Sequence, residues 1–213
     1  MIPPYFKQER NATCTLAVLR MVLATYDKFV SEDELRSKVI KDYGSHFKNI
    51  WNPTIAKLAA EFGLKVTMYA KWPLFKINIT QQAQSEYKKH GEKANITQYE
   101  NPDDNDIGTE PLPLAYKEMF KALDTGVKPI YGCLTEKVIR NALENNQLIL
   151  ATVVLSKLYP NENVKGHHGI LIYNADGDKI FYHDPYYGPS LTTTFTEFHK
   201  SQDTVAAGIV FGV

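Results

Sequence analysis

Apolar and polar positions divide the chain into an early part that predicts helices and a later part that predicts strands. Residues 14–26 are apolar on nearly every side of a helical wheel, which predicts a buried helix that begins at Cys14. Ser31 and Glu34 have the spacing of a capping box and predict a short amphipathic helix to about Ile40. The first part of the chain therefore predicts a helical layer with one fully buried helix.

The remaining pattern places most strands after residue 147. The further elements that the sequence predicts are a helix at 55–62, a strand at 64–70, a helix at 112–123, a strand at 128–133, a helix at 136–145, a strand at 147–155, a hairpin of 170–173 and 179–182, a helix at 194–200 and a strand at 206–213. Helices early and antiparallel strands late are typical of an α+β protein. Because residues from about 71 to 130 are on average more polar, we expect one domain, 1–213, with an insertion at about 71–130.

Net charge and hydropathy argue against some classes of function. The 213 residues include 24 Lys and Arg against 24 Asp and Glu, so the formal net charge is zero and gives no general attraction for nucleic acid. No run of about eighteen apolar residues occurs, which argues against membrane insertion. The first residues lack the basic-then-apolar order of a signal peptide. We therefore expect a cytoplasmic protein, with secretion by a route independent of a signal peptide left open.

The chain has two cysteines, Cys14 and Cys133, which can form one disulfide at most. A disulfide scaffold is therefore excluded, and the hypothesis to consider is chemistry at a single thiol. A thiolate is the nucleophile in cysteine catalysis, and the start of a helix favours negative charge by about 0.3 to 1 kcal/mol. The alternative is that Cys14 is a small buried side chain, because free cysteines are often buried.

A general base for the thiol would come from His167 or His168, with Asp184 as its partner. A hairpin with a three-residue loop centred on Asp176 would put positions 168 and 184 opposite each other. A two-residue Asp-Gly loop would instead put Asp184 on the face of His167, so hairpin geometry leaves both histidines open. His183 and Asp184 point to opposite faces of a strand, so we expect no metal site and no cofactor.

Five spaced elements of the sequence together resemble the papain-like cysteine peptidases of the bacteriocin-processing type, which cut after double-glycine leaders. The matching residues are Gln8 six positions before Cys14; Ala17, Leu19, Met21 and Tyr26 in the helix; His168-Gly169-Ile170-Leu171-Ile172-Tyr173; and Asp184-Pro185. The resemblance covers about two-thirds of the chain and leaves 71–130 without a counterpart. It implies a papain-like α+β fold, with the nucleophile helix in an N-terminal helical half and an antiparallel sheet in the C-terminal half.

The resemblance also implies roles for four residues. Cys14 would be the nucleophile, His168 the general base and then acid, Asp184 the group that orients the imidazole, and Gln8 with the Cys14 N–H the oxyanion hole. These roles predict a cysteine peptidase that cleaves a peptide or amide bond of a peptide or protein substrate through a thioester.

Three positions depart from the family's pattern. Thr15 stands where the family usually has Gly, Thr13 stands where it often has Asp, and His167 adds a second imidazole as a candidate auxiliary residue. These departures bear on the substrate more than on the chemistry. Two alternatives to the peptidase stay open: an acyltransferase of the transglutaminase-like or phytochelatin-synthase-like type, and a non-catalytic module that binds peptides. The sequence predicts no oligomeric state.

Overall fold

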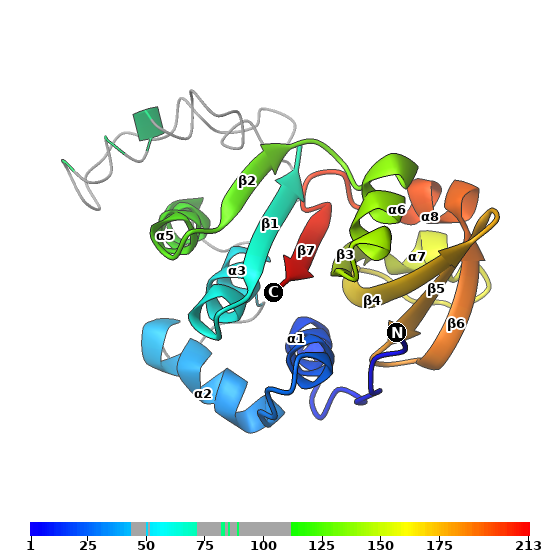
Figure 1. The fold of residues 1–213 in the computed structure, drawn as a ribbon, viewed down its shortest axis with the longest axis horizontal. Helices are drawn as coiled ribbons and strands as arrows, with labels where there is room; N and C mark the ends of the chain where they lie inside the picture. Colours follow the sequence, from blue (N-terminus) through cyan, green and yellow to red (C-terminus); the bar gives the residue numbers. More distant parts are fainter. Residues whose placement is uncertain (44–49, 51, 72–81, 84, 86–88, 90–111) are drawn as a thin grey trace.

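The computed structural model describes residues 1–43, 50, 52–71, 82–83, 85, 89 and 112–213. Its strands form one seven-stranded sheet in the order β2-β1-β7-β3-β4-β5-β6 (Figure 1). The strands are β1 Lys65–Ala70, β2 Lys128–Tyr131, β3 Leu148–Val154, β4 His167–Asp176, β5 Lys179–Asp184, β6 Gly188–Thr194 and β7 Gly208–Gly212. The helices are α1 Cys14–Thr25, α2 Glu32–Tyr43, α3 Asn52–Glu61, α5 Leu112–Asp124, α6 Glu136–Glu144, α7 Leu155–Leu158 and α8 Phe195–Ser201.

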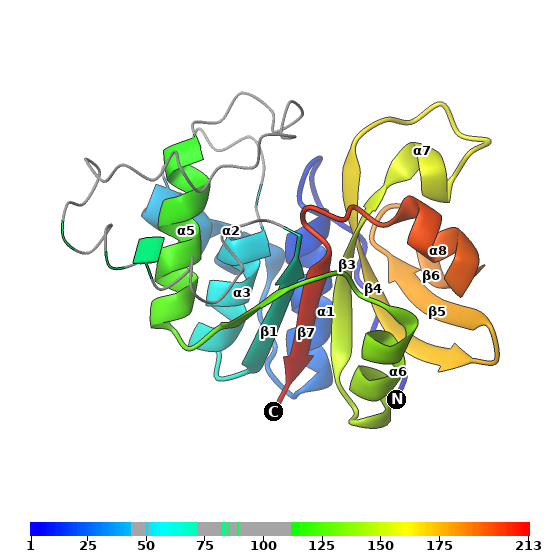
Figure 2. The same ribbon diagram turned by 90° about the horizontal axis from the view of Figure 1, so that it is seen from above.

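The sheet is antiparallel except at one edge. β2 pairs with β1 in parallel, whereas β7 lies antiparallel between β1 and β3 (Figure 2). The predicted α+β class is therefore confirmed as a mixed α+β fold, with one parallel pair that the sequence pattern did not predict.

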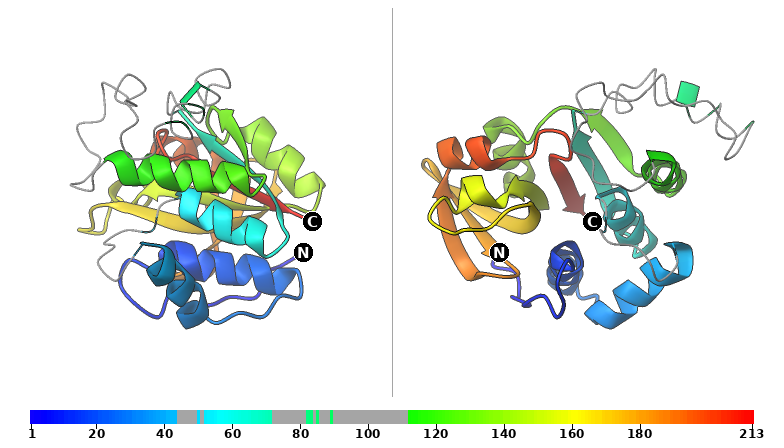
Figure 3. Two further views of the ribbon diagram at one scale, coloured as in Figure 1. Left: turned by 90° about the vertical axis from the view of Figure 1, so that its left-hand side faces the viewer. Right: turned by 180° about the vertical axis from the view of Figure 1, so that it is seen from behind.

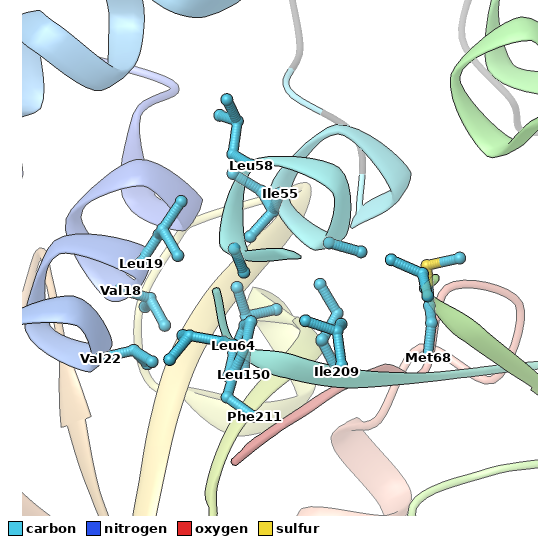
Figure 4. Close-up of a cluster of buried hydrophobic side chains, with 14 of the residues drawn as sticks. Val18, Leu19, Val22, Ile55, Leu58, Leu64, Met68, Leu150, Ile209 and Phe211 are labelled. Atoms are coloured by element: carbon cyan, nitrogen blue, oxygen red, sulfur yellow. The ribbon is translucent and has the colours of Figure 1, made fainter. Parts of the chain in front are cut away.

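Each central strand contributes alternate residues to two apolar cores, because successive side chains point to opposite faces of a sheet. In β3, Leu148 and Leu150 belong to one core and Ile149 and Ala151 to the other. The first core packs beneath α1 and α3, and Figure 4 shows side chains of both helices converging on those of β7 and β3. The second core includes the apolar faces of α6 and α8.

Helix α1 is as buried as its composition predicts. Only three of its twelve residues, Cys14, Arg20 and Thr25, fall outside the buried class, so the helix is enclosed on nearly all sides. Seen from behind, α1 lies with α2 on one side and with the N-terminal segment and β5 on the other (Figure 3). The start of this helix, with Cys14 as its first residue, is thereby fixed relative to β4.

The local helix signals are confirmed. Glu34 accepts the N–H and the hydroxyl of Ser31, and its own N–H donates to the Ser31 hydroxyl, which completes the capping box. The Thr135 hydroxyl accepts the Val138 N–H at the start of α6.

Two elements were not predicted. α7 is a single turn, and β6 is an edge strand of mostly polar residues in which Pro189 is tolerated because the outer side of an edge strand needs no N–H donor.

Two described elements, α5 and β2, lie within the predicted insertion. β2 extends the sheet and α5 packs against α3, so these parts of 71–130 belong to the main structure. The rest of the insertion falls mostly outside the described residues, and its boundaries stay a prediction. Among the residues that the structure describes, no helix is long and apolar enough to cross a membrane.

Candidate active site

A bulge in β4 decides which histidine meets Asp184. The hairpin loop is the two-residue Gly177-Asp178, since Asp176 pairs with Lys179. That register alone would place Asp184 on the face of His167. The register shifts between Ile172 and Asn174, so that Ile172 pairs with Tyr182. This one-residue shift moves Asp184 to the face of His168.

The Asp184 carboxylate is buried and accepts four hydrogen bonds. Its side chain is fully buried, and its Oδ1 accepts from His168 Nε2 at 2.8 Å and from the N–H groups of Tyr186 and Tyr187 at 2.8 and 3.0 Å. Its Oδ2 accepts the hydroxyl of Tyr159 at 2.8 Å. Burial by itself would raise the pKa of this carboxyl, but His168 and the other donors hold it below its usual range. Asp184 is therefore a fixed anion behind the imidazole.

Tyr159 is a site residue that the sequence reasoning missed. It lies just after α7, its hydroxyl is 3.2 Å from that of Tyr182, and its ring packs against Tyr187 with centroids 4.2 Å apart. Burial, followed by the contacts with Tyr182 and Asp184, raises its pKa, so it acts as a neutral donor. No local motif marks it, because its link to Asp184 exists only in the folded sheet.

His168 is held as a cation. Its side chain is 7% exposed, and burial alone would lower its pKa. The hydrogen bond to Asp184, followed by the contacts with Cys14, instead raises the pKa to about 9. Because Nε2 donates to Asp184, Nδ1 is the nitrogen left to serve the thiol.

Cys14 is the first residue of α1 and lies within hydrogen-bonding reach of His168. Burial would raise the pKa of its thiol, but the hydrogen bond and charge of His168, together with the backbone N–H groups of Gly169 and Thr15, lower it below its ordinary value. A thiol with a lowered pKa beside an imidazole with a raised pKa favours a thiolate–imidazolium pair.

Gly169 allows α1 to approach β4 at this point. A Cβ at position 169 would lie 3.0 Å from Cγ2 of Thr15, closer than ordinary contact. The absence of a side chain at Gly169 thus lets the start of α1 reach the strand that carries His168.

Gln8 lies close to the site, but its side-chain amide is engaged differently from the prediction. Its backbone N–H donates to the carbonyl of Pro185 at 3.0 Å, which ties it to the residue after Asp184. Its side-chain Nε2 donates to the Arg10 carbonyl at 2.9 Å. An amide carries two N–H bonds, so this contact orients the group and leaves a second donor.

His167, the expected auxiliary imidazole, is directed elsewhere. Its side chain is 55% exposed and its Nε2 lies 3.5 Å from Oδ2 of Asp203, in the segment before β7. Alternation of side chains along β4 directs His167 to the opposite face from His168, and its auxiliary role stays a prediction.

His183 has a role in holding the N-terminal segment. Its Nε2–H donates to the carbonyl of Pro3 at 2.9 Å and its Nδ1 accepts the N–H of Ser190 at 3.0 Å. Burial lowers its pKa, in keeping with a neutral ring that joins the N-terminal segment to β6. Within the described ranges, no group of three or more His, Cys, Asp or Glu residues could hold a metal ion. Cys14 and Cys133 are both free thiols.

Fold and site together define a mixed α+β protein in which a thiol at a helix start meets a histidine–carboxylate pair from a sheet. The chain belongs to the family described as Guanylylate cyclase, whose model matches residues 3–206. That family is not the bacteriocin-processing peptidase family that the sequence resembles, so the family match does not support the resemblance.

A solved structure from Bacillus anthracis with the provisional description C39-like peptidase is similar at 11% identity and a TM-score of 0.47. The match covers 100% of this chain and 97% of that one. No curated protein matches the sequence.

Proposed function

We propose that the protein is a cysteine hydrolase of peptide or amide bonds, with Cys14 as nucleophile, His168 as base and acid, and Asp184 as orienting carboxylate. The observation that carries the proposal is the series of contacts from the Cys14 thiol to the imidazole of His168 and on to the buried Asp184, which accepts four hydrogen bonds. Such an arrangement has the roles of a nucleophile, a base and an orienting group.

The first half of the proposed reaction forms a thioester. The thiolate of Cys14 attacks the substrate carbonyl carbon, and the carbonyl oxygen becomes an oxyanion. The N–H of Cys14, which has no partner within its own helix, and the second N–H of Gln8 Nε2 would stabilise that charge. His168 then donates its proton to the leaving amine as the C–N bond breaks.

The second half regenerates the thiol site. His168, now neutral, takes a proton from water as the water oxygen attacks the thioester carbonyl. The C–S bond breaks, the carboxylic acid leaves, and the thiolate–imidazolium pair is restored. An amine in place of water would give acyl transfer, so the choice of acceptor separates the hydrolase from the acyltransferase alternative.

The name of the family favours a second candidate, cyclisation of GTP. In that reaction the ribose 3′ oxygen attacks the α-phosphate and pyrophosphate leaves, which calls for cationic groups around phosphates. The described site offers an imidazolium and a thiolate, a pairing that suits a carbonyl better than a triphosphate. We therefore place amide hydrolysis first and include GTP among the substrates to be tested.

Product analysis by mass spectrometry tests the proposal. The chain would be incubated with peptides containing Gly-Gly, Gly-Ala and isopeptide bonds, with and without an added amine, and separately with GTP and Mg²⁺. We expect peptide cleavage to free acids, lost in Cys14→Ala and kept in the matched Cys133→Ala. Cyclic GMP formation that survives Cys14→Ala would contradict the proposal, and amine adducts in place of free acids would favour an acyltransferase.

A further inference from the structure

The segment that joins Gln8 to Cys14 is held by side chains of two helices. Arg20 of α1 donates to Oε1 of Glu9 at 2.8 Å, and its guanidinium lies over the ring of Phe6 at 4.1 Å. The segment has no regular structure of its own, and Ala12 has a φ of 62°, a conformation that residues with a side chain rarely adopt. Its shape therefore depends on contacts with its surroundings.

Glu32 provides the most buried of these contacts. It is the first residue of α2 and only 1% exposed, yet its carboxylate serves neither as the cap of its own helix nor in the thiol site. Both of its oxygens lie near the N–H of Glu9, at 3.3 and 3.1 Å. A buried carboxylate costs stability unless it is hydrogen-bonded, so its position needs these partners.

Glu9 links Glu32 to Gln8. Its N–H, held by the Glu32 carboxylate, lies between Gln8 and the Arg10 carbonyl in the sequence. That carbonyl accepts Nε2 of Gln8 at 2.9 Å and the hydroxyl of Thr13 at 2.8 Å. Glu32 thus holds the backbone at Glu9, beside the carbonyl that orients the amide of Gln8.

We propose that Glu32 is a positioning residue for the oxyanion hole, acting on Gln8 through the Glu9 N–H and the neighbouring Arg10 carbonyl. The inference rests on the function proposed above and adds to it a residue on α2 that touches neither the thiol nor the substrate.

Two reactions of Cys14 separate this role from a general effect on the thiol. Iodoacetamide alkylates the thiolate by direct displacement of iodide, and no oxyanion forms. p-Nitrophenyl acetate acylates it: the sulfur attacks the carbonyl carbon, an oxyanion forms, and the bond to p-nitrophenolate breaks. A residue that only positions oxyanion donors will affect the second reaction and leave the first unchanged.

The experiment measures both rates in single variants. Removal of an oxyanion-hole donor costs about 100-fold or more, so we expect Gln8→Ala to slow acylation by about 100-fold and Glu32→Ala by about 10-fold. Thr13→Val, which removes the hydroxyl at constant shape, should follow Glu32→Ala, and Thr13→Ser should retain the wild-type rate. Alkylation should stay within about twofold of wild type in each of them.

The matched control is Asp33→Ala. Asp33 is the neighbouring acid on α2, and its exposed carboxylate lies 3.4 Å from the Arg10 side chain, so its loss changes charge at the same helix start and leaves the acceptor of the Glu9 N–H in place. We expect it to leave both rates unchanged. The double variant Gln8→Ala with Glu32→Ala should be no slower than Gln8→Ala alone, because both changes remove one function.

The outcomes are separable. A Glu32→Ala variant that acylates at the wild-type rate, or that loses alkylation and acylation equally, overturns the role of Glu32, as does full additivity in the double variant. A wild-type protein that is alkylated at Cys14 but never acylated overturns the proposed function itself, and the positioning role with it.

Discussion

Nε2 of His168 lies 2.8 Å from Oδ1 of Asp184, and this contact exists because β4 contains a one-residue register shift near Tyr173. Without that shift, the two-residue hairpin loop would direct Asp184 to the face of His167. The carboxylate gains three further donors, two of them from the turn after Pro185. The bulge in β4 therefore determines which histidine is hydrogen-bonded to Asp184.

Loss of the Asp184 charge should weaken catalysis through His168. In Asp184→Asn the attraction that raises the pKa of His168 to about 9 is removed, so that pKa should fall towards its ordinary value. We expect peptide cleavage to drop by about 100-fold or more, as for orienting carboxylates in other triads. NMR titration of His168 beside the kinetics checks this, and an unchanged pKa would contradict it.

Tyr159→Phe should show how much the hydrogen bond from Tyr159 to Asp184 contributes to stability. The change removes one neutral donor to a buried carboxylate, which costs about 1.5 to 3 kcal/mol of unfolding free energy. Urea unfolding measures it, and Tyr186→Phe is the control because Tyr186 is 56% exposed. Equal stability of the two variants would show that the Tyr159 hydroxyl does not support Asp184.

The pH dependence of stability should report the His168 cation. Its folded-state pKa, about 9, lies above its ordinary 6.5, so folding favours the protonated form. This contribution is fully present below pH 6.5 and is lost as the pH rises through about 9. Because the Cys14 thiol loses a proton on folding over the same pH range, the test removes it. We expect the Tm of Cys14→Ala to fall as the pH rises above 6.5, and the double variant with His168→Gln to show a smaller fall; parallel curves would contradict the assignment.

Gly169→Ala should move α1 away from β4. The new methyl would lie 3.0 Å from Cγ2 of Thr15, and overpacking of this kind costs about 1 to 3 kcal/mol. The double variant with Thr15→Ala removes the clashing methyl and should recover both stability and cleavage. If the double variant is no better than Gly169→Ala, the close approach of Thr15 is not the reason for glycine here.

Local signals in the sequence predicted local structure well. The buried α1 and the caps at Ser31 and Thr135 depend on residues a few positions apart, and all are present in the structure. The parallel pairing of β2 with β1 could not be predicted, because 57 residues separate Ala70 from Lys128 and no periodicity fixes a partner.

The site was predictable only in part, for the same reason. A family resemblance pointed to Cys14, His168 and Asp184, whereas hairpin geometry alone left His167 equally open until the bulge was known. Tyr159 carries no motif and reaches Asp184 only through a tertiary contact.

The alkylation rate of Cys14 at pH 6 tests the central claim most directly, with Cys133 in the same chain as the internal reference. Iodoacetamide labelling followed by peptide mass spectrometry gives both rates in one sample. We expect Cys14 to react at least about tenfold faster than Cys133, and His168→Gln to abolish the difference, because the imidazolium keeps the thiol ionised below its ordinary pKa. Equal rates in the wild type, or a Cys14 rate that does not depend on His168, would contradict the account.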